Sequence, residues 1–372
     1  MIRVLHVIGK MDCGGAETLL MNLYRNIDRS KIQFDFMVHT SEKGFYDEEI
    51  IKLGGKIYTA PTFNVVNILQ YSRFWKKFYQ THSEHLIIHG HINSSAAIYL
   101  NEAKKQGRIA VVHSHNTKTK EKNLRALAFN AFSYPIRHIA DYFFGCSYQA
   151  GIDRFGKKIA DSNRFQVLNN GIDASLYIYN PSIRYTMRER LNINENTTVI
   201  GHVGRFAPQK NHFFLLKIFE SYHKINKNSE LWLIGKGELE KEIRKKVKEF
   251  DLLKSVKFFG VTDCVQEYLQ AMDVFVFPSI YEGLGIAVVE AQAAGLPCIV
   301  SEAIVPEADI GAGLMKHNNL SDSLLLWNKS IDESLDQKRK NTFNYVINAG
   351  YDIKAISTYL SQFYFNILKK AG

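Results

Sequence analysis

The sequence predicts an α/β protein of two domains, each a doubly wound parallel sheet with helices on both faces. Three observations predict this fold class. Short apolar runs of strand length alternate with longer segments of helical periodicity. The alternation weakens over Ala174–Asn196 and then begins again. The chain has 372 residues, more than one hydrophobic core usually serves.

The first half of the chain predicts seven strands with helices between them. The predicted strands are Ile2–Ile8, Phe34–His39, Lys56–Thr59, His85–Ile88, Ile109–His113, Tyr142–Cys146 and Phe165–Leu168. The predicted helices are Ala16–Arg25, Tyr46–Leu53, Val65–Gln80 and Ser94–Gln106. Ligands of such sheets bind beyond the carboxyl ends of the strands. Gly14-Gly15, His89–His91 and His113–Asn116 fall at these ends. Gly14-Gly15 favours close approach of another group to the backbone, and a plain tight turn is the alternative.

The second half repeats the pattern. The predicted strands are Thr198–Val203, Glu230–Ile234, Val256–Phe259, Val274–Phe277 and Cys298–Val300. The predicted helices are His212–Tyr222, a charged helix ending at Phe250, Val265–Ala271, Ile286–Ala294, helical structure over Asn318–Asn348, and Ile353–Lys369. We expect domains at residues 1–176 and 177–352, with the helix of residues 353–372 packing back on the first domain.

Composition and charge narrow the functional classes. The chain is 46% hydrophobic and 23% charged, as ordinary globular proteins are, and no apolar run approaches the ~20 residues of a membrane span. His6, Gly9 and Lys10 interrupt the first apolar run, which predicts a strand and not a signal peptide. Four scattered cysteines indicate free thiols in a reducing cytoplasm. The net charge of +10 favours phosphorylated ligands or an anionic membrane, because no nucleic-acid-binding module is recognisable.

Two segments are candidates for membrane contact. Thr117–Arg137 begins with basic residues and continues with aliphatic and aromatic ones. This pattern fits a basic amphipathic helix on an anionic membrane as well as it fits an ordinary surface helix. Phe74–Tyr79 is a second candidate of the same kind.

The stretch Val274–Ser301 predicts the centre of the functional site. It reads as strand, glycine loop, helix and strand, and the loop presents backbone N–H groups at the start of a helix. That arrangement binds anions, yet Glu282 and Glu290 flank it. Carboxylates repel phosphate and accept hydrogen bonds from paired hydroxyls, so a sugar nucleotide satisfies both features. An ordinary solvated charge on the helix is the alternative for Glu290.

Five motifs in this order resemble the retaining glycosyltransferases of family four (glycosyltransferase group 1), which have the GT-B fold of two Rossmann-like domains facing across a cleft. The motifs are Gly14-Gly15-Ala16-Glu17, His113-Ser114-His115-Asn116, Asn169-Asn170-Gly171-Ile172-Asp173, Gly204-Arg205-Phe206 through Lys210, and Glu282 through Glu290 with Gly283 and Gly285 between. The resemblance covers essentially the whole chain and is strongest to bacterial capsular and exopolysaccharide enzymes.

The resemblance implies roles for individual residues. His115 and Glu282 would form the catalytic centre, with Glu282 on the donor sugar and Glu290 on the ribose. The donor phosphates would be bound by Gly14, Gly15, Arg205, Lys210, Gly285, Ile286 and Ala287. Arg205 offers a planar fork of donors and Lys210 a point charge. His89 and His91 are weaker candidates on the acceptor side, and His113 fits a packed core histidine.

The expected activity is therefore transfer of a hexosyl unit from a nucleotide sugar, in particular a UDP-sugar, to a lipid-linked saccharide at the inner face of the plasma membrane. The alternatives are a soluble or protein acceptor, or a non-catalytic subunit that binds nucleotide sugars. The chain has no Asp-x-Asp sequence, so we expect no essential metal and no cofactor beyond the donor. A dehydrogenase is disfavoured because the dinucleotide-binding glycine motif is missing.

Overall fold

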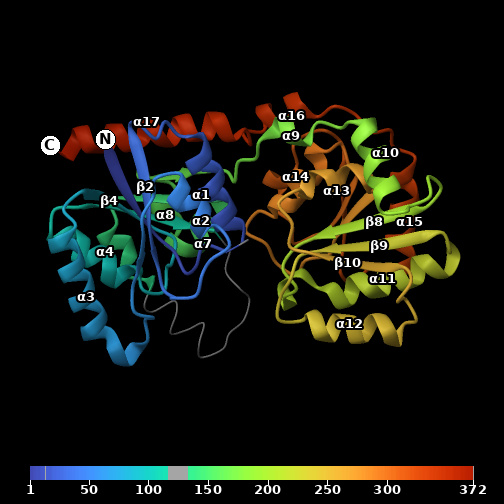
Figure 1. The fold of residues 1–372 in the computed structure, drawn as a ribbon, viewed down its shortest axis with the longest axis horizontal. Helices are drawn as coiled ribbons and strands as arrows, with labels where there is room; N and C mark the ends of the chain where they lie inside the picture. Colours follow the sequence, from blue (N-terminus) through green and yellow to red (C-terminus); the bar gives the residue numbers. More distant parts are fainter. Residues whose placement is uncertain (13, 116–132, 372) are drawn as a thin grey trace. The chain divides into compact units, whose positions relative to one another are not determined.

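The chain folds into two compact units, Met1–Ile172 with Asp352–Gly372 and Asp173–Tyr351. Figure 1 shows this computed structural model, which describes residues 1–12, 14–115 and 133–371. The two-sheet α/β prediction is confirmed, because each unit contains one sheet whose paired strands are parallel.

The first unit is built on a seven-stranded sheet in the order β3-β2-β1-β4-β5-β6-β7. Its strands are β1 (Ile2–Val7), β2 (Ile32–Val38), β3 (Ile57–Thr59), β4 (His85–Gly90), β5 (Ile109–Ser114), β6 (Tyr142–Gly145) and β7 (Phe165–Val167). Its helices are α1 (Gly15–Asn26), α2 (Asp47–Lys52), η1 (Val65–Asn67), α3 (Ile68–Thr81), α4 (Ala96–Lys105), α6 (Ile136–Ile139), α7 (Tyr148–Phe155), α8 (Lys157–Ala160) and α17 (Ile353–Ala371).

The two faces of this sheet are covered by different helices. Helices α1 and α17 pack on one face around Leu20, Phe34 and Tyr364, while α3 and α4 pack on the other around Trp75 and Tyr99. Figure 1 shows α17, in red, lying along the first unit. A sheet buried on both faces needs apolar residues throughout, which is why its strands read as continuous apolar runs.

The second unit is built on a six-stranded sheet in the order β10-β9-β8-β11-β12-β13. Its strands are β8 (Thr198–Val203), β9 (Ser229–Ile234), β10 (Val256–Gly260), β11 (Val274–Phe277), β12 (Cys298–Ser301) and β13 (Met315–Asn318). Its helices are α9 (Ala174–Tyr177), α10 (Pro181–Arg190), η2 (Pro208–Lys210), α11 (His212–Ile225), α12 (Glu240–Glu249), α13 (Val265–Ala271), α14 (Ile286–Ala293), η3 (Pro306–Ala308), α15 (Leu324–Leu335) and α16 (Phe343–Asn348).

One segment differs from its prediction. Residues 318–348 were expected to be helical, but the structure places strand β13 directly before them and divides the rest between α15 and α16. The strand was hidden because its sequence, Met-Lys-His-Asn, is polar, and it lies at the edge of the sheet with two exposed residues. Periodicity did not reveal the helices α6 to α10, of which α6, α8 and α9 have only four residues each.

The candidate membrane segments have different outcomes. Residues 117–132 of the segment Thr117–Arg137 lie outside the described residues. In α3 the aromatic residues Trp75 and Phe78 are buried in the core, so they offer no membrane anchor. The basic residues of this helix are exposed, namely Arg73, Lys76 and Lys77. In the part of the chain that the structure describes, no helix combines the length and apolarity that crossing a bilayer would require.

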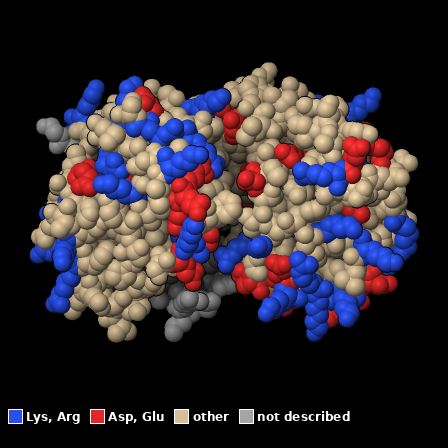
Figure 2. All heavy atoms as spheres, in the orientation of Figure 1, with Lys and Arg blue, Asp and Glu red and all other residues tan. Residues whose placement is uncertain are grey.

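Surface charge elsewhere is mixed in sign. Figure 2 shows basic and acidic side chains intermingled on the second unit. On α12, for example, Arg244 pairs with Glu240, and Lys246 pairs with Glu249. The net charge of +10 therefore does not make this helix a uniformly basic surface.

Candidate functional site

Lys210 and Glu282 form an ion pair at the carboxyl ends of two neighbouring strands in the second unit. The Nζ of Lys210 lies 2.7 Å from Oε1 of Glu282, and the two side chains are only 16% and 7% exposed. Lys210 Nζ also lies 4.5 Å from the centre of the Phe277 ring. Lys210 ends η2 after β8, and Glu282 lies in the loop after β11, which pairs with β8. The sheet order thus brings together two residues 72 positions apart.

Backbone and amide hydrogen bonds hold these two loops against each other. The Ile280 N–H donates to the carbonyl of Gln209 at 2.8 Å. The side-chain amide of Gln209 donates to the carbonyl of Tyr281 at 2.9 Å. Because both neighbours of the ion pair are fixed in this way, Lys210 and Glu282 are positioned before any ligand arrives. Gln209 was not identified from the sequence.

The glycine loop leads into α14 through a left-handed residue. Gly285 has φ +85° and ψ 54°, and it is the N-cap of α14. That conformation disfavours residues with a Cβ, which explains glycine here. Ile286 and Ala287 follow in the first turn, where backbone N–H groups have no partner four residues earlier in the helix. The predicted phosphate-binding amides therefore lie together at one helix start.

Glu290 lies further along α14 and is partly buried. Its Oε1 accepts a hydrogen bond from the Tyr177 hydroxyl at 3.0 Å. Burial raises the pKa of the Glu290 carboxyl to about 7, and the hydrogen bond from Tyr177 acts in the opposite direction. A solvated surface charge would not show this rise. Tyr177 was not identified from the sequence, because it lies 113 residues away on α9.

Arg205 is placed differently from Lys210. Its side chain is 73% exposed, and its Nη2 lies 3.0 Å from Oε2 of Glu238. Among the described residues it makes no ion pair with Glu282. The structure thus divides the two predicted phosphate-binding cations into a buried Lys210 and a surface Arg205.

The remaining predicted residues lie in the first unit. Gly14 is the N-cap of α1, and Gly15 is its first residue. A Cβ added at Gly15 would have no atom within 4 Å, so the space beside this backbone is open. His115 follows β5, and its Nε2 lies 2.7 Å from Nδ1 of His91. Burial lowers the pKa of His115 to about 4, so this imidazole is neutral at physiological pH. Asn116 lies outside the described residues.

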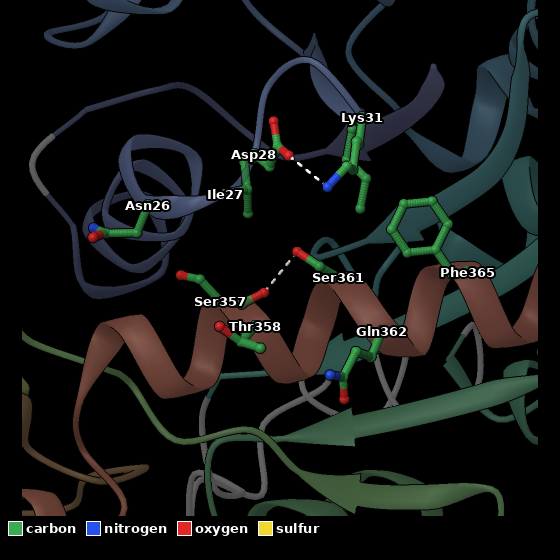
Figure 3. Close-up of a pocket in the computed structure, with 10 residues that line it drawn as sticks. Asn26, Ile27, Asp28, Lys31, Ser357, Thr358, Ser361, Gln362 and Phe365 are labelled. Carbon is green, nitrogen blue, oxygen red and sulfur yellow. Dashed lines mark hydrogen bonds and ion pairs between the residues drawn. The ribbon is translucent and has the colours of Figure 1, made fainter.

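A pocket of about 260 Å³ in the first unit contains none of these residues. Figure 3 shows that it lies between α17 and the segment joining α1 to β2. Lys31 and Ile32 mark the amino end of β2, whereas ligands of parallel sheets bind at the carboxyl ends. Two of its side chains are already engaged with each other, in the Asp28–Lys31 ion pair. We assign no function to this pocket.

Curated relatives show the family. Residues 184–312 match the family described as "Glycosyl transferases group 1". EpsF of Bacillus subtilis strain 168, which carries the name of a glycosyltransferase, is 36% identical over 335 residues, 88% of this chain and 86% of EpsF. CapH of Staphylococcus aureus, a capsular polysaccharide biosynthesis glycosyltransferase, is 25% identical over 92% of this chain and 94% of CapH.

A third relative has a more specific name. It is the UDP-Gal:alpha-D-GlcNAc-diphosphoundecaprenol alpha-1,3-galactosyltransferase of Escherichia coli, 30% identical over 52% of each chain.

Solved structures share the fold. The crystal structure of Anabaena Alr3699/HepE in complex with UDP and glucose superposes with a TM-score of 0.80, over 98% of this chain and 100% of that one, at 19% identity. The likeness shows two Rossmann-like units of the GT-B class. With the sequence relatives, it leads to one conclusion: this chain belongs to the group 1 glycosyltransferases, with homologues in bacterial polysaccharide biosynthesis.

Proposed function

We propose that the chain is a retaining glycosyltransferase that moves a hexosyl unit from a UDP-sugar to a lipid-linked saccharide in cell-surface polysaccharide biosynthesis. The observation that carries this proposal is the pairing of Lys210 with Glu282 beside the start of α14. A cation, a helix N-terminus and a carboxylate within one loop cluster provide for phosphate and for sugar hydroxyls together.

Different residues of this loop cluster bind different parts of the donor. Lys210 and the amides of Gly285, Ile286 and Ala287 neutralise the diphosphate, and Arg205 adds a fork of donors from the surface. When a donor phosphate replaces Glu282 as the partner of Lys210, the Glu282 carboxylate becomes available to the sugar hydroxyls. Glu290 accepts from the ribose hydroxyls. This set of cations and amides requires no metal ion on the diphosphate.

Retention of the anomeric configuration follows from a front-side mechanism. The acceptor hydroxyl attacks the face from which the diphosphate departs, and a phosphate oxygen takes the proton. The new glycosidic bond forms as the bond between sugar and phosphate breaks. His115, neutral because it is buried, hydrogen-bonds a donor hydroxyl, and Gly15 leaves room for the donor beside the backbone.

The relatives support the donor and acceptor classes. The name of the Escherichia coli relative specifies UDP-galactose and a diphosphoundecaprenol-linked acceptor, and the HepE crystals hold UDP and glucose. With a lipid-linked acceptor, the reaction would take place at the inner face of the plasma membrane. The exposed Arg73, Lys76 and Lys77 of α3 offer electrostatic attraction to anionic lipids, worth about 1 kcal/mol for each cation at the surface.

A thermal-shift screen of nucleotide sugars, followed by product analysis, tests this function. We expect UDP-sugars to raise Tm and one of them to support transfer to a polyprenyl-diphosphate saccharide. NMR of the new linkage should show the anomeric configuration of the donor. An inverted product would refute retention, and turnover only with soluble or protein acceptors would favour the alternative. Binding without transfer to any acceptor would indicate a non-catalytic subunit.

A further inference from the structure

Five histidines gather on one face of the first unit's sheet, at the carboxyl ends of three adjacent strands. His6 of β1 is in register with His89 of β4, and His89 is in register with Val111 of β5. Side chains two residues apart in a strand share a face. His91 therefore lies beyond His89 on this face, with His113 and His115 beyond Val111.

The rings of this cluster are in close contact. Nδ1 of His6 lies 3.0 Å from Nε2 of His91, and Nδ1 of His91 lies 2.7 Å from Nε2 of His115. The ring centres of His113 and His115 are 4.0 Å apart. His91 is thus the central member, with a different imidazole beside each of its nitrogens.

His113 has the least satisfied nitrogens of the cluster. Its side chain is 1% exposed, and neither ring nitrogen has a hydrogen-bond partner among the described residues. The same holds for Nδ1 of His115. An unsatisfied buried polar atom destabilises the folded state, so such atoms call for a physical explanation. A bound ligand of the ring nitrogens would provide one.

The donor set identifies the class of ligand. Ring nitrogens bind metal in the neutral form of imidazole. Imidazole nitrogens suit zinc, cobalt, nickel and copper, whereas magnesium and calcium require oxygen ligands.

We propose that His91, His113 and His115 form a binding site for a divalent transition-metal ion of the zinc or cobalt type. One ring nitrogen from each lies within 4.8 Å of the others. Tetrahedral coordination at 2.0–2.1 Å separates ligand nitrogens by about 3.4 Å, so small ring movements complete the site. His115 is the partly exposed member, and it leaves a fourth position for water or a substrate oxygen.

His6 supports this site from behind. When Nδ1 of His91 binds the metal, its Nε2 carries the proton and donates it to Nδ1 of His6, which orients the His91 ring. A second trio, His6, His89 and His91, also brings its nitrogens within 4.8 Å. It is fully buried, and Nδ1 of His89 already lies 2.7 Å from the Tyr364 hydroxyl, so it offers no open position.

The proposed metal site lies in the first unit, whereas Lys210, Glu282 and Glu290 belong to the second. His115 is shared with the proposed function, but metal binding is measured without donor or acceptor. The inference therefore holds or fails on metal binding, whether or not the chain transfers a sugar.

Titration of tag-free protein with Co²⁺ tests the site, after treatment with a chelator. We expect one Co²⁺ per chain, intense visible d–d absorption of a tetrahedral ion, displacement by Zn²⁺, and a rise in Tm with either metal. His113→Gln and His115→Gln should each weaken binding by at least about tenfold. His317→Gln, in the second unit, is the control and should bind as the wild type does.

The outcomes separate the alternatives. If the wild type binds no Co²⁺ or Zn²⁺ stoichiometrically, the proposal is wrong. Binding that survives both substitutions but is lost in His89→Gln would assign the metal to the buried trio and overturn our assignment. His113→Gln is judged only if its circular dichroism matches the wild type. If His113→Gln does not fold as the wild type does, Co²⁺ binding by His115→Gln, which changes a partly exposed position, decides whether the site is assigned correctly.

Discussion

Lys210 and Glu282 are paired at 2.7 Å although each is expected to meet a different part of the donor. The pair is nearly buried, so removing one partner takes the ion pair away from a charge that water reaches poorly. The same two side chains therefore serve the stability of the empty protein and the binding of its ligand. A substitution at either position has to be interpreted on both counts.

A double-mutant cycle separates these contributions. We expect Lys210→Met and Glu282→Gln each to lower the free energy of unfolding by about 2–4 kcal/mol, and the double variant to lose less than the sum. All three should lose transfer activity. The measurements are urea unfolding and turnover. Lys224→Met is the control: Lys224 pairs with Glu220 at the same 2.7 Å but is 67% exposed, so it should change stability by less than about 1 kcal/mol. Strict additivity in the cycle would contradict the coupling.

Gly285→Ala should impair donor binding through the backbone. The residue has φ +85°, and the nearest atom to an added Cβ is 3.5 Å away, so the cost is conformational and not a clash. We expect a loss of about 1–2 kcal/mol in stability and weaker UDP-sugar binding, with Gly285→Asn less harmful. Gly311→Ala is matched to it, with φ +76° and no atom within 4 Å. It should cost similar stability and leave donor binding unchanged.

Donor affinity should rise with pH through about 7. The ribose hydroxyls need the ionised Glu290 carboxylate, and burial raises its pKa to about 7. Calorimetric titration with a UDP-sugar between pH 5.5 and 8.5 measures this effect. Glu290→Gln should bind more weakly and lose this pH dependence. An unchanged pH profile in the variant would show that another group is responsible.

The same shift affects stability, with a definite sign. A carboxyl whose folded pKa is raised contributes stability that is fully present below the unfolded pKa of 4.5 and is lost as pH rises through about 7. Glu290→Gln removes this loss. Relative to the wild type, the variant should gain of the order of 1–3 kcal/mol between pH 4.5 and pH 8 in chemical unfolding. A difference that shrinks as pH rises would contradict the assignment.

Arg205→Ala should weaken donor binding without lowering the stability of the fold. Arg205 is 73% exposed, so we expect no measurable change in unfolding and an increase of about tenfold in the KM for the donor. Glu238→Gln is the informative control, because it removes the partner and leaves Arg205 in place. If Arg205 serves the phosphate, Glu238→Gln keeps or improves donor affinity. An equal loss in both variants would make the ion pair itself the functional element.

Membrane attachment through α3 should depend on salt. Arg73, Lys76 and Lys77 are exposed, whereas the aromatic residues of the helix are buried except for the partly buried Phe74, so we expect a mainly electrostatic attraction. Replacing all three by Gln should reduce sedimentation with phosphatidylglycerol vesicles at low salt and leave Tm within a few degrees. Replacing Lys241, Lys245 and Lys248 on the mixed-charge helix α12 provides the control. If both triple variants lost vesicle binding equally, the attraction would depend on the net charge of the protein and not on α3.

Much of the fold could be predicted because it is encoded locally. Strands such as Val274–Phe277 are recognisable as apolar runs, because both faces of the sheet are covered by helices and the strand residues on each face are buried. The polar edge strand Met315–Asn318 was missed for the same reason, because an edge strand need not be apolar. The glycine loop was recognised because Gly285 is needed where φ is positive.

The chain by itself determined which residues carry the candidate chemistry and which ends of the strands they follow. Tertiary structure decided their partners: Lys210 with Glu282 across 72 residues, Glu290 with Tyr177 across 113, and His91 with His6 and His115. These pairings depend on strand order and register, which bring together loops that are remote along the chain. Periodicity and turn residues report only the local conformation of each segment, so the contacts between segments emerge only when the sheets assemble.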